Sequence, residues 1–219
     1  MDIRAEENKL FQKWIDNTHV EDFVFDGVVN PSEWYEMPIR IVFLLKETNG
    51  FRDDLRVFLD SGGRWMTWNN VARWTYALRQ MYIKDVNPQW ESVNRINKEK
   101  RKNNLRKVAV INVKKQMGGT TTNTVKLIEI FRKYNKEFFV EQLNMLGHID
   151  FLICCGKGVA TCVEESVNEE LLWKRIRSGV RRATTLKGTV VVDFFHPQSR
   201  YRSKELFLLF CEAVSPKYA

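Results

Sequence analysis

The hydrophobic residues of this chain gather in four short runs, each typical of a buried β-strand. The runs cover residues 39–45, 108–113, 149–155 and 190–196, and they are rich in β-branched and aromatic side chains. Continuous apolar runs of this length are typical of strands covered on both faces, as in parallel sheets. The pattern therefore predicts four central strands.

Between these runs, hydrophobic residues recur at the spacing of amphipathic helices. We expect helices over residues 3–17, 68–82, after a cap at Asn123, over 137–147, around 171–176 and over 203–214. Alternation of strands with helices implies parallel pairing through right-handed crossovers. The prediction is one α/β domain over residues 1–219, a three-layer α/β/α sandwich with a central, mainly parallel four-stranded sheet.

The net charge of +8 is concentrated in two segments. Residues 84–107 carry eight Lys or Arg against three Asp or Glu, and residues 174–187 carry six basic residues and no acid. We interpret residues 84–107 as a basic, partly helical insert. Local basicity of this kind favours a nucleic-acid partner, and the alternative is a solvated surface without a partner.

The positions of the cysteines and the lengths of the apolar runs indicate the cellular compartment. No apolar run approaches the roughly 18–20 residues that span a bilayer, and the first ten residues lack a secretory core. The cysteines, at 154, 155, 162 and 211, have no zinc or disulfide spacing, so we interpret them as small buried hydrophobic residues. We expect a cytoplasmic or nucleoid-associated monomer without a membrane partner.

Polar side chains follow each predicted strand at its carboxyl end. In chain order these positions are Glu47, Thr48 and Asn49, then Asn112, then Gly156, Lys157 and Gly158, and last His196 and Ser199. In a parallel sheet the carboxyl ends meet at one edge, so we expect these residues to share a pocket. A carboxylate, an amide and an imidazole over backbone amides suit a hydrolytic reaction.

In order and spacing, these strand ends resemble the uracil-DNA glycosylase superfamily. The segment Leu45-Lys-Glu-Thr-Asn-Gly50 is similar to the acidic motif after that family's first strand, and Asn112 to the asparagine that ends its second strand. Gly156 follows the third strand as in the family, and His196-Pro-Gln-Ser199 resembles its His-Pro-Ser motif.

The resemblance implies a role for each side chain in hydrolysis of an N-glycosidic bond. Glu47 would position or activate the water that attacks the sugar C1′. Asn112 would hydrogen-bond the edge of the flipped base, and His196 would stabilise the base as it leaves with negative charge. Neither a cofactor nor a metal is expected.

The resemblance also implies contacts to the base and to single- or double-stranded DNA. Phe51 would stack on the base, with Trp65 as the alternative, and Asn49 would lie in the base site. The expected DNA contacts are Lys114, Gly118, Gly119, Thr120, Gly156, Lys157, Ser199, Arg200, Tyr201 and Arg202. Arg200 and Tyr201 stand where the family inserts a wedge into the duplex. Lys114 and Lys115 are expected to be solvated neighbours of phosphates.

The chain departs from the family pattern at several points. Asn49 replaces a proline, Lys46 stands where a glycine is usual, and the wedge loop lacks its apolar residue. The cysteines do not fit the spacing that holds an iron–sulfur cluster in some relatives. The leading hypothesis is a DNA glycosylase acting on a uracil-like or modified base. The alternatives are a non-catalytic nucleic-acid-binding module on the same fold and a hydrolase of free nucleosides or nucleotides.

Each of the three central residues also has a structural interpretation. Glu47 would then pair with a surface lysine, Asn112 would cap the next turn, and His196 would cap the end of its strand. The two interpretations predict different surroundings for each side chain.

Overall fold

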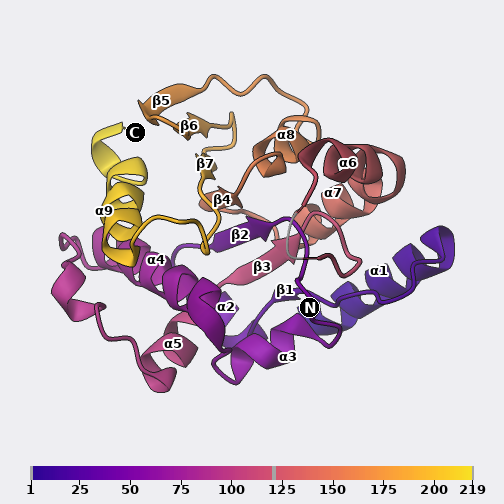
Figure 1. Ribbon diagram of the computed structural model, residues 1–219, viewed down its shortest axis with the longest axis horizontal. Helices are drawn as coiled ribbons and strands as arrows, with labels where there is room; N and C mark the ends of the chain where they lie inside the picture. The colour runs from indigo at the N-terminus through magenta and orange to yellow at the C-terminus, as the bar shows by residue number, and fades with distance from the viewer. Residues whose placement is uncertain (1, 120–121, 219) are drawn as a thin grey trace.

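The computed structural model describes residues 2–119 and 122–218, and these form a seven-stranded mixed sheet with helices (Figure 1). The strands are β1 (Gly27–Val28), β2 (Ile41–Leu45), β3 (Ala109–Asn112), β4 (Phe151–Cys155), β5 (Lys174–Arg177), β6 (Val180–Thr184) and β7 (Val190–Phe194). Their order across the sheet is β1-β3-β2-β4-β7-β6-β5. The central strands β3, β2, β4 and β7 are parallel, and the three outer strands are antiparallel.

The four predicted strands are the four parallel ones, but the expected total of four was wrong. The structure adds β1 beside β3 and the hairpin of β5 and β6 beside β7. The hairpin also replaces the helix predicted around 171–176. Its turn contains Gly179 with φ +74°, a left-handed backbone angle that glycine adopts without strain. In β6, Val180 points into the core while Arg181 is half-exposed, which is the alternation of a strand.

The α-helices of the described residues are α1 (Ile3–Thr18), α2 (Pro31–Glu36), α3 (Leu55–Asp60), α4 (Trp65–Ile83), α5 (Lys98–Leu105), α6 (Thr124–Ile130), α7 (Lys136–Met145), α8 (Val159–Glu164) and α9 (Ser203–Ala213). The other predicted helices correspond to α1, α4, α6, α7 and α9, and α5 lies in the partly helical insert, whereas α2, α3 and α8 were not predicted. Asn123 caps α6 as predicted, since its side chain accepts from the backbone N–H of Lys126. A π-helical turn, Phe131–Asn135, joins α6 to α7.

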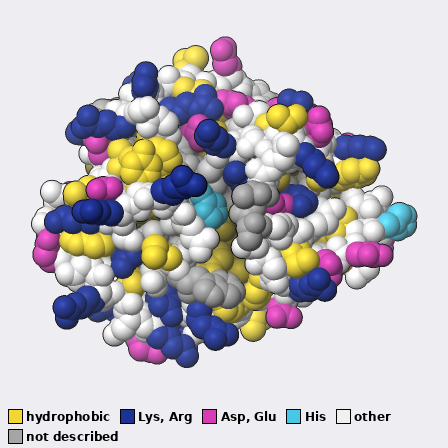
Figure 2. Space-filling view, in the orientation of Figure 1, with side chains coloured by type: hydrophobic (Ala, Val, Ile, Leu, Met, Phe, Trp, Pro, Cys, Tyr) yellow, Lys and Arg dark blue, Asp and Glu magenta, His cyan; other side chains and the backbone are white. Residues whose placement is uncertain are grey.

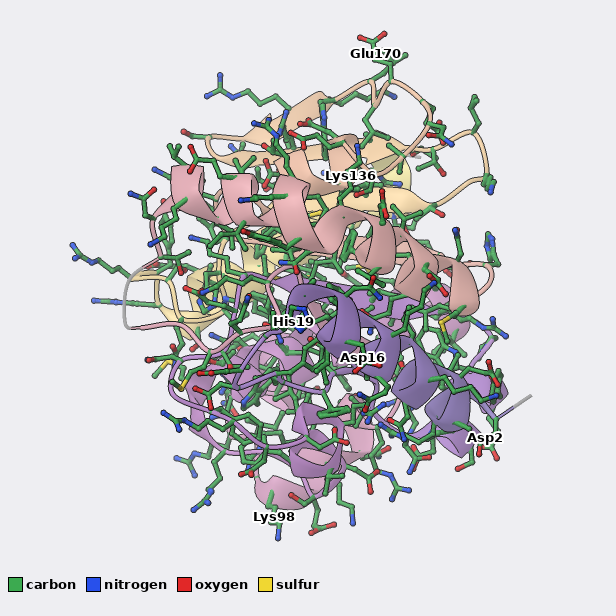
Figure 3. The ribbon with its side chains drawn as sticks, turned by 90° about the vertical axis from the view of Figure 1, so that its right-hand side faces the viewer. Asp2, Asp16, His19, Lys98, Lys136 and Glu170 are labelled. Carbon is green, nitrogen blue, oxygen red and sulfur yellow. The ribbon has the colours of Figure 1, made fainter. Side chains whose placement is uncertain are left out.

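Alternate residues of the parallel strands face two separate hydrophobic cores. Phe43 of β2 packs in one core with Trp74 of α4 and Phe210 of α9. The rings of Trp74 and Phe210 stack with their centroids 5.1 Å apart. Leu44 packs in the opposite core with residues of α1, α7 and α8. Figure 3 shows α1 and the α6–α7 run side by side on this second face. The sheet is therefore covered on both faces, which explains its continuous apolar runs.

The basic insert at residues 84–107 is attached to α4 through hydrogen bonds to backbone carbonyls. Arg73 of α4 donates to Val93 O at 3.0 Å, and Arg101 of α5 donates to Gly63 O at 2.9 Å. Val93 and Leu105 are buried in the core beside α4. Arg101 is therefore a structural residue of the insert.

The four cysteines are free thiols within the apolar interior, which confirms their interpretation as small hydrophobic residues. Cys154, Cys155 and Cys162 are buried and Cys211 is half-buried, and burial raises the pKa of all four thiols. In the part of the chain that the structure describes, no helix has the length and apolarity needed to span a membrane.

Candidate functional site

A cavity of about 230 Å³ lies at the carboxyl ends of β2, β3 and β7. Its lining residues are Leu45, Glu47, Thr48, Asn49, Phe51, Leu55, Thr67, Trp68, Asn112, His196 and Gln198. All three residues expected to take part in hydrolysis line it, together with Asn49 and Phe51 from the expected base site. The side chain of Trp65 is outside the described structure.

The loops after β2 and β3 run side by side because their pairing continues beyond the strands. The N–H of Val113 donates to Leu45 O at 2.9 Å, and the N–H of Lys114 donates to Lys46 O at 2.9 Å. Further on, Asn49 and Gly118 form an isolated parallel bridge. This extended pairing places the acidic loop against the glycine loop.

The Glu47 carboxylate lies between these two loops and is 7% exposed. Its Oε1 accepts from Thr122 Oγ1 at 2.8 Å, and its Oε2 forms an ion pair with Lys114. A second cavity of about 220 Å³, lined by Lys114, Gly118 and Thr122 among others, also has Glu47 in its wall. A lysine partner is therefore present, but the pair is mostly buried and borders two cavities.

Gly118 is required by the close approach of Glu47. A Cβ added at Gly118 would overlap the Glu47 carboxylate, whereas one added at Gly119 would meet nothing within 4 Å. Neither glycine has a positive φ, so alanine fits both backbones. We expect Gly118→Ala to displace the Glu47 carboxylate and to lower the free energy of unfolding by about 1–3 kcal/mol, with Gly119→Ala near the native value. Urea denaturation of both variants tests this, and equal stabilities would contradict it.

Asn112, at the end of β3, is 1% exposed and is held by Asp26. Its backbone N–H and its Nδ2 both donate to Asp26 Oδ2, at 2.8 Å and 3.0 Å. Its Oδ1 is buried without a hydrogen-bond partner in the described structure. A buried acceptor of this kind, on a cavity wall, suits a ligand N–H group.

His196 follows β7, and its ring is fixed by the turn that Pro197 begins. Nδ1 accepts the backbone N–H of Gln198 at 3.1 Å, which leaves the ring proton on Nε2. The carbonyl of Pro197 accepts from Asn70 Nδ2 of α4 at 2.7 Å and anchors the turn. Burial, together with repulsion from Lys46, lowers the pKa of His196 to about 4. The imidazole at neutral pH is therefore an uncharged donor.

Trp68 is the principal cavity residue that the sequence did not identify as functional. Its helical spacing predicted a core position, and it is indeed part of α4, 5% exposed and packed in the core that contains Phe43. It also lines the cavity, and its Nε1–H has no hydrogen-bond acceptor in the described structure. Helical spacing indicates burial equally for core and cavity aromatics, so no sequence signal separates the two.

The expected DNA contacts fall in three segments of the chain and have different surroundings. A Cβ at Gly156 would contact Lys46 and His196, so this glycine lies against the site, with Lys157 exposed beside it. Arg200, Tyr201 and Arg202 are exposed, whereas Ser199 Oγ is buried without a partner among the described residues. Lys114 is paired with Glu47, Gly118 and Gly119 line the second cavity, and Thr120 lies outside the described residues.

The expectation that Lys115 is solvated was wrong. Its side chain is 0% exposed, forms an ion pair with Asp26 and donates to Gln142 Oε1 at 2.9 Å. Its ammonium lies over the rings of Phe11 and Trp14, at 5.5 Å and 5.0 Å from their centroids, and the N–H of Val24 donates to Lys115 O at 2.9 Å.

The two basic segments lie at opposite ends of the molecule, with the β5–β6 hairpin at the top and α5 at the bottom of Figure 1. Figure 2 shows Lys and Arg side chains scattered over this face, near its centre as well as around its edge, rather than in one continuous patch. Part of this charge is used internally, since Lys107 pairs with Glu33 and Arg181 with Asp193. Lys98, Lys100 and Arg175 remain exposed.

No protein-family model and no curated protein matches this sequence. Within the described residues, no group of three or more His, Cys, Asp or Glu side chains is placed to hold a metal ion. The geometry of the cavity is therefore the main guide to function.

Proposed function

We propose that the chain is a DNA glycosylase that hydrolyses the N-glycosidic bond of a flipped, uracil-like or modified base. The observation that carries this proposal is the cavity lined by all three of Glu47, Asn112 and His196. These residues follow three different strands, and the cavity also has two orphaned polar groups in its walls, Asn112 Oδ1 and Trp68 Nε1. Unpaired buried groups of this kind favour a ligand with complementary donors and acceptors.

The proposed hydrolysis assigns one step to each side chain. The water oxygen bonds to C1′ as the C1′–N bond breaks, Glu47 orients the water and takes its proton, and the bonding electrons leave with the base. The Nε2–H of His196 donates a hydrogen bond to the base as negative charge develops on it. Asn112 Oδ1 accepts an N–H of the base edge, and Phe51 stacks on its face.

The proposal also covers the layers of the fold, the oligomeric state and the cellular location. The two cores on opposite faces of the sheet support a three-layer α/β/α arrangement around the parallel strands. We propose that residues 1–219 act as one domain, as a monomer on DNA, in the cytoplasm or at the nucleoid. Arg200 and Tyr201 are exposed and follow the cavity residue Gln198 closely in the sequence, which supports DNA as the partner.

A specific observation favours a second candidate, a binding module that has lost catalysis. Both oxygens of Glu47 are already engaged, one by Thr122 and the other by Lys114. A carboxylate accepts up to about four hydrogen bonds, so each oxygen of Glu47 keeps the capacity to accept one more from a water. The glycosylase proposal needs that remaining capacity, and the binding module does not.

The test is an assay for abasic sites on oligonucleotides carrying uracil, hypoxanthine, thymine mismatches or modified bases. We expect alkali-cleavable product from at least one base. Binding of these oligonucleotides without product from any base would favour the binding module. Release of base only from free nucleosides would favour the nucleoside hydrolase.

The basic insert provides a separate prediction about DNA affinity. We expect Lys98→Ala with Lys100→Ala to weaken binding to every oligonucleotide and to reduce the slope of log K against log salt by about 1–2, because two phosphate contacts are lost. The matched control is Lys9→Ala with Lys13→Ala on α1, which pair with Glu6 and Glu141. Titrations between about 50 and 200 mM salt measure the slopes. An unchanged slope for the first pair would identify the insert as a solvated surface.

A further inference from the structure

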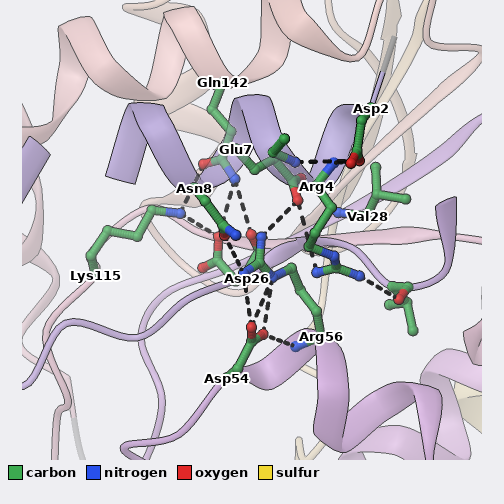
Figure 4. Close-up of polar contacts among 12 residues, drawn as sticks. Asp2, Arg4, Glu7, Asn8, Asp26, Val28, Asp54, Arg56, Lys115 and Gln142 are labelled. Carbon is green, nitrogen blue, oxygen red and sulfur yellow. Dashed lines mark hydrogen bonds and ion pairs between the residues drawn. The ribbon is translucent and has the colours of Figure 1, made fainter. Parts of the chain in front are cut away.

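Two neighbouring pairs of buried charged side chains, Lys115 with Asp26 and Arg56 with Glu7, lie in the interior (Figure 4). Lys115, Asp26 and Glu7 are 0% exposed and Arg56 is 2% exposed. Arg56 Nη1 donates to Glu7 Oε2 at 2.9 Å, and Glu7 Oε1 accepts the backbone N–H of Val28 at 2.9 Å. Burial raises the pKa of Glu7 and lowers that of Lys115, and the oppositely charged partners oppose both shifts.

Buried charges of this kind rarely contribute net stability, since removal from water cancels most of their mutual attraction. Their retention in a protein is better explained by a geometric requirement. In the described chain, the residue that both bonds the Asp26–Lys115 pair and lines the first cavity is Asn112. This pair therefore acts on the site through its contact with Asn112.

The contacts of Asp26 define the orientation of the Asn112 amide. Asp26 Oδ1 is engaged by Lys115 and by Gln142 Nε2 at 3.2 Å, so Oδ2 is left for Asn112. A carboxylate paired with lysine accepts hydrogen bonds and donates none. Rotating the amide by 180° would place two acceptors, Asn112 Oδ1 and Asp26 Oδ2, against each other, while Oδ2 would keep only the backbone N–H of Asn112. The amide nitrogen must therefore face Asp26.

We propose that Asp26, held by Lys115, is a positioning residue that fixes the Asn112 amide with Oδ1 available to the ligand. The site then selects a base edge that presents a ring N–H at this point and rejects an edge that presents a ring nitrogen lone pair. This inference rests on the proposed function, because it names the edge that the base must offer. Uracil and hypoxanthine carry the ring N–H, whereas cytosine and adenine carry the lone pair.

The test compares the native protein with Asp26→Asn/Lys115→Met. This double variant removes both charges together at nearly constant volume, and the asparagine introduced at position 26 is able to bond the Asn112 amide in either orientation. Binding is measured to oligonucleotides with one uracil or one cytosine, and with one hypoxanthine or one adenine. We expect the native protein to prefer the N–H-bearing base of at least one pair about tenfold or more, and the variant to reduce that preference to within about twofold.

The matched control is Glu7→Gln/Arg56→Met, which removes the neighbouring buried pair, and neither of its members bonds Asn112. It should keep the native preference, whereas loss of preference in both variants would assign the effect to general loosening and overturn the proposal. Lack of preference in the native protein, or full preference in Asp26→Asn/Lys115→Met, would also overturn it.

A second measurement applies even if the double variant does not fold. In the native protein, one Nδ2 proton of Asn112 should exchange with solvent at least about tenfold more slowly than exposed asparagine amides, because it is bonded to Asp26. Its signal is assigned by its loss in Asn112→Asp. Fast exchange of both protons would overturn the proposal. Absence of abasic product would instead count against the glycosylase, so the two failures are distinguishable.

Discussion

Replacing Glu47 by glutamine is expected to slow base release at least about 100-fold while DNA affinity stays within about threefold of the native value. Glutamine keeps the size of the side chain and its acceptor for Thr122, but it removes the negative charge that orients water and stabilises positive charge at C1′. Single-turnover kinetics on the preferred oligonucleotide measure the effect on chemistry alone.

The matched control for this substitution is Glu33→Gln. Glu33 also pairs with a lysine, Lys107, and is also partly buried, at 23% exposure, but it lies away from the cavity. Glu33→Gln should leave the rate of base release unchanged. A comparable loss in both variants, or a loss of binding in Glu47→Gln, would mean that Glu47 is a structural residue of the two loops.

His196 is expected to titrate near pH 4 rather than near its ordinary value of 6.5. The ring is therefore neutral throughout the physiological range, and its titration should not appear in the rate between about pH 6 and 8. Because the folded pKa is depressed, His196 favours the folded state fully above pH 6.5, and this contribution is lost as pH falls toward 4. NMR of the ring protons measures the midpoint, and Lys46→Met should raise it by removing a repelling charge. A midpoint near 6.5 would contradict the inferred burial.

The four parallel strands could be predicted because each is buried on both faces and therefore apolar over its whole length. The three antiparallel strands lacked this signal. β1 is only two residues long, Gly27–Val28, and the edge strand β5 is exposed and basic. The hairpin did leave one signal in the sequence, the Ser178-Gly179 pair, which is typical of a turn. The helical spacing of Leu172 and Ile176 favoured the wrong element there.

The convergence of Glu47, Asn112 and His196 could also be predicted, because it follows from parallel topology alone. Strand ends meet at one edge whatever the packing details are. What could not be predicted is how tertiary contacts use these residues. The sequence around Lys115 is typical of a solvated lysine, and Asp26 lies in a segment without periodicity. Only the fold brings them together under Asn112.

Removing one member of the buried Asp26–Lys115 pair is expected to cost about 3–5 kcal/mol of the free energy of unfolding, because the remaining charge is left buried without its partner. Lys115→Met leaves the Asp26 carboxylate buried without its cation, and Asp26→Asn leaves the Lys115 ammonium buried without its anion. The double variant Asp26→Asn/Lys115→Met should lose much less than the sum of the two, since neither charge remains. Urea denaturation of the native protein and the three variants, followed by tryptophan fluorescence, measures these energies.

Additive losses in this cycle would indicate that the pair makes no specific interaction and that each side chain matters for packing alone. Strong coupling between the two stability losses, together with altered base preference in the double variant, would separate the role of the pair in folding from its role in orienting Asn112. Its charges are then dispensable for folding when removed together, and the requirement that keeps them in the core is the orientation of the Asn112 amide at the cavity.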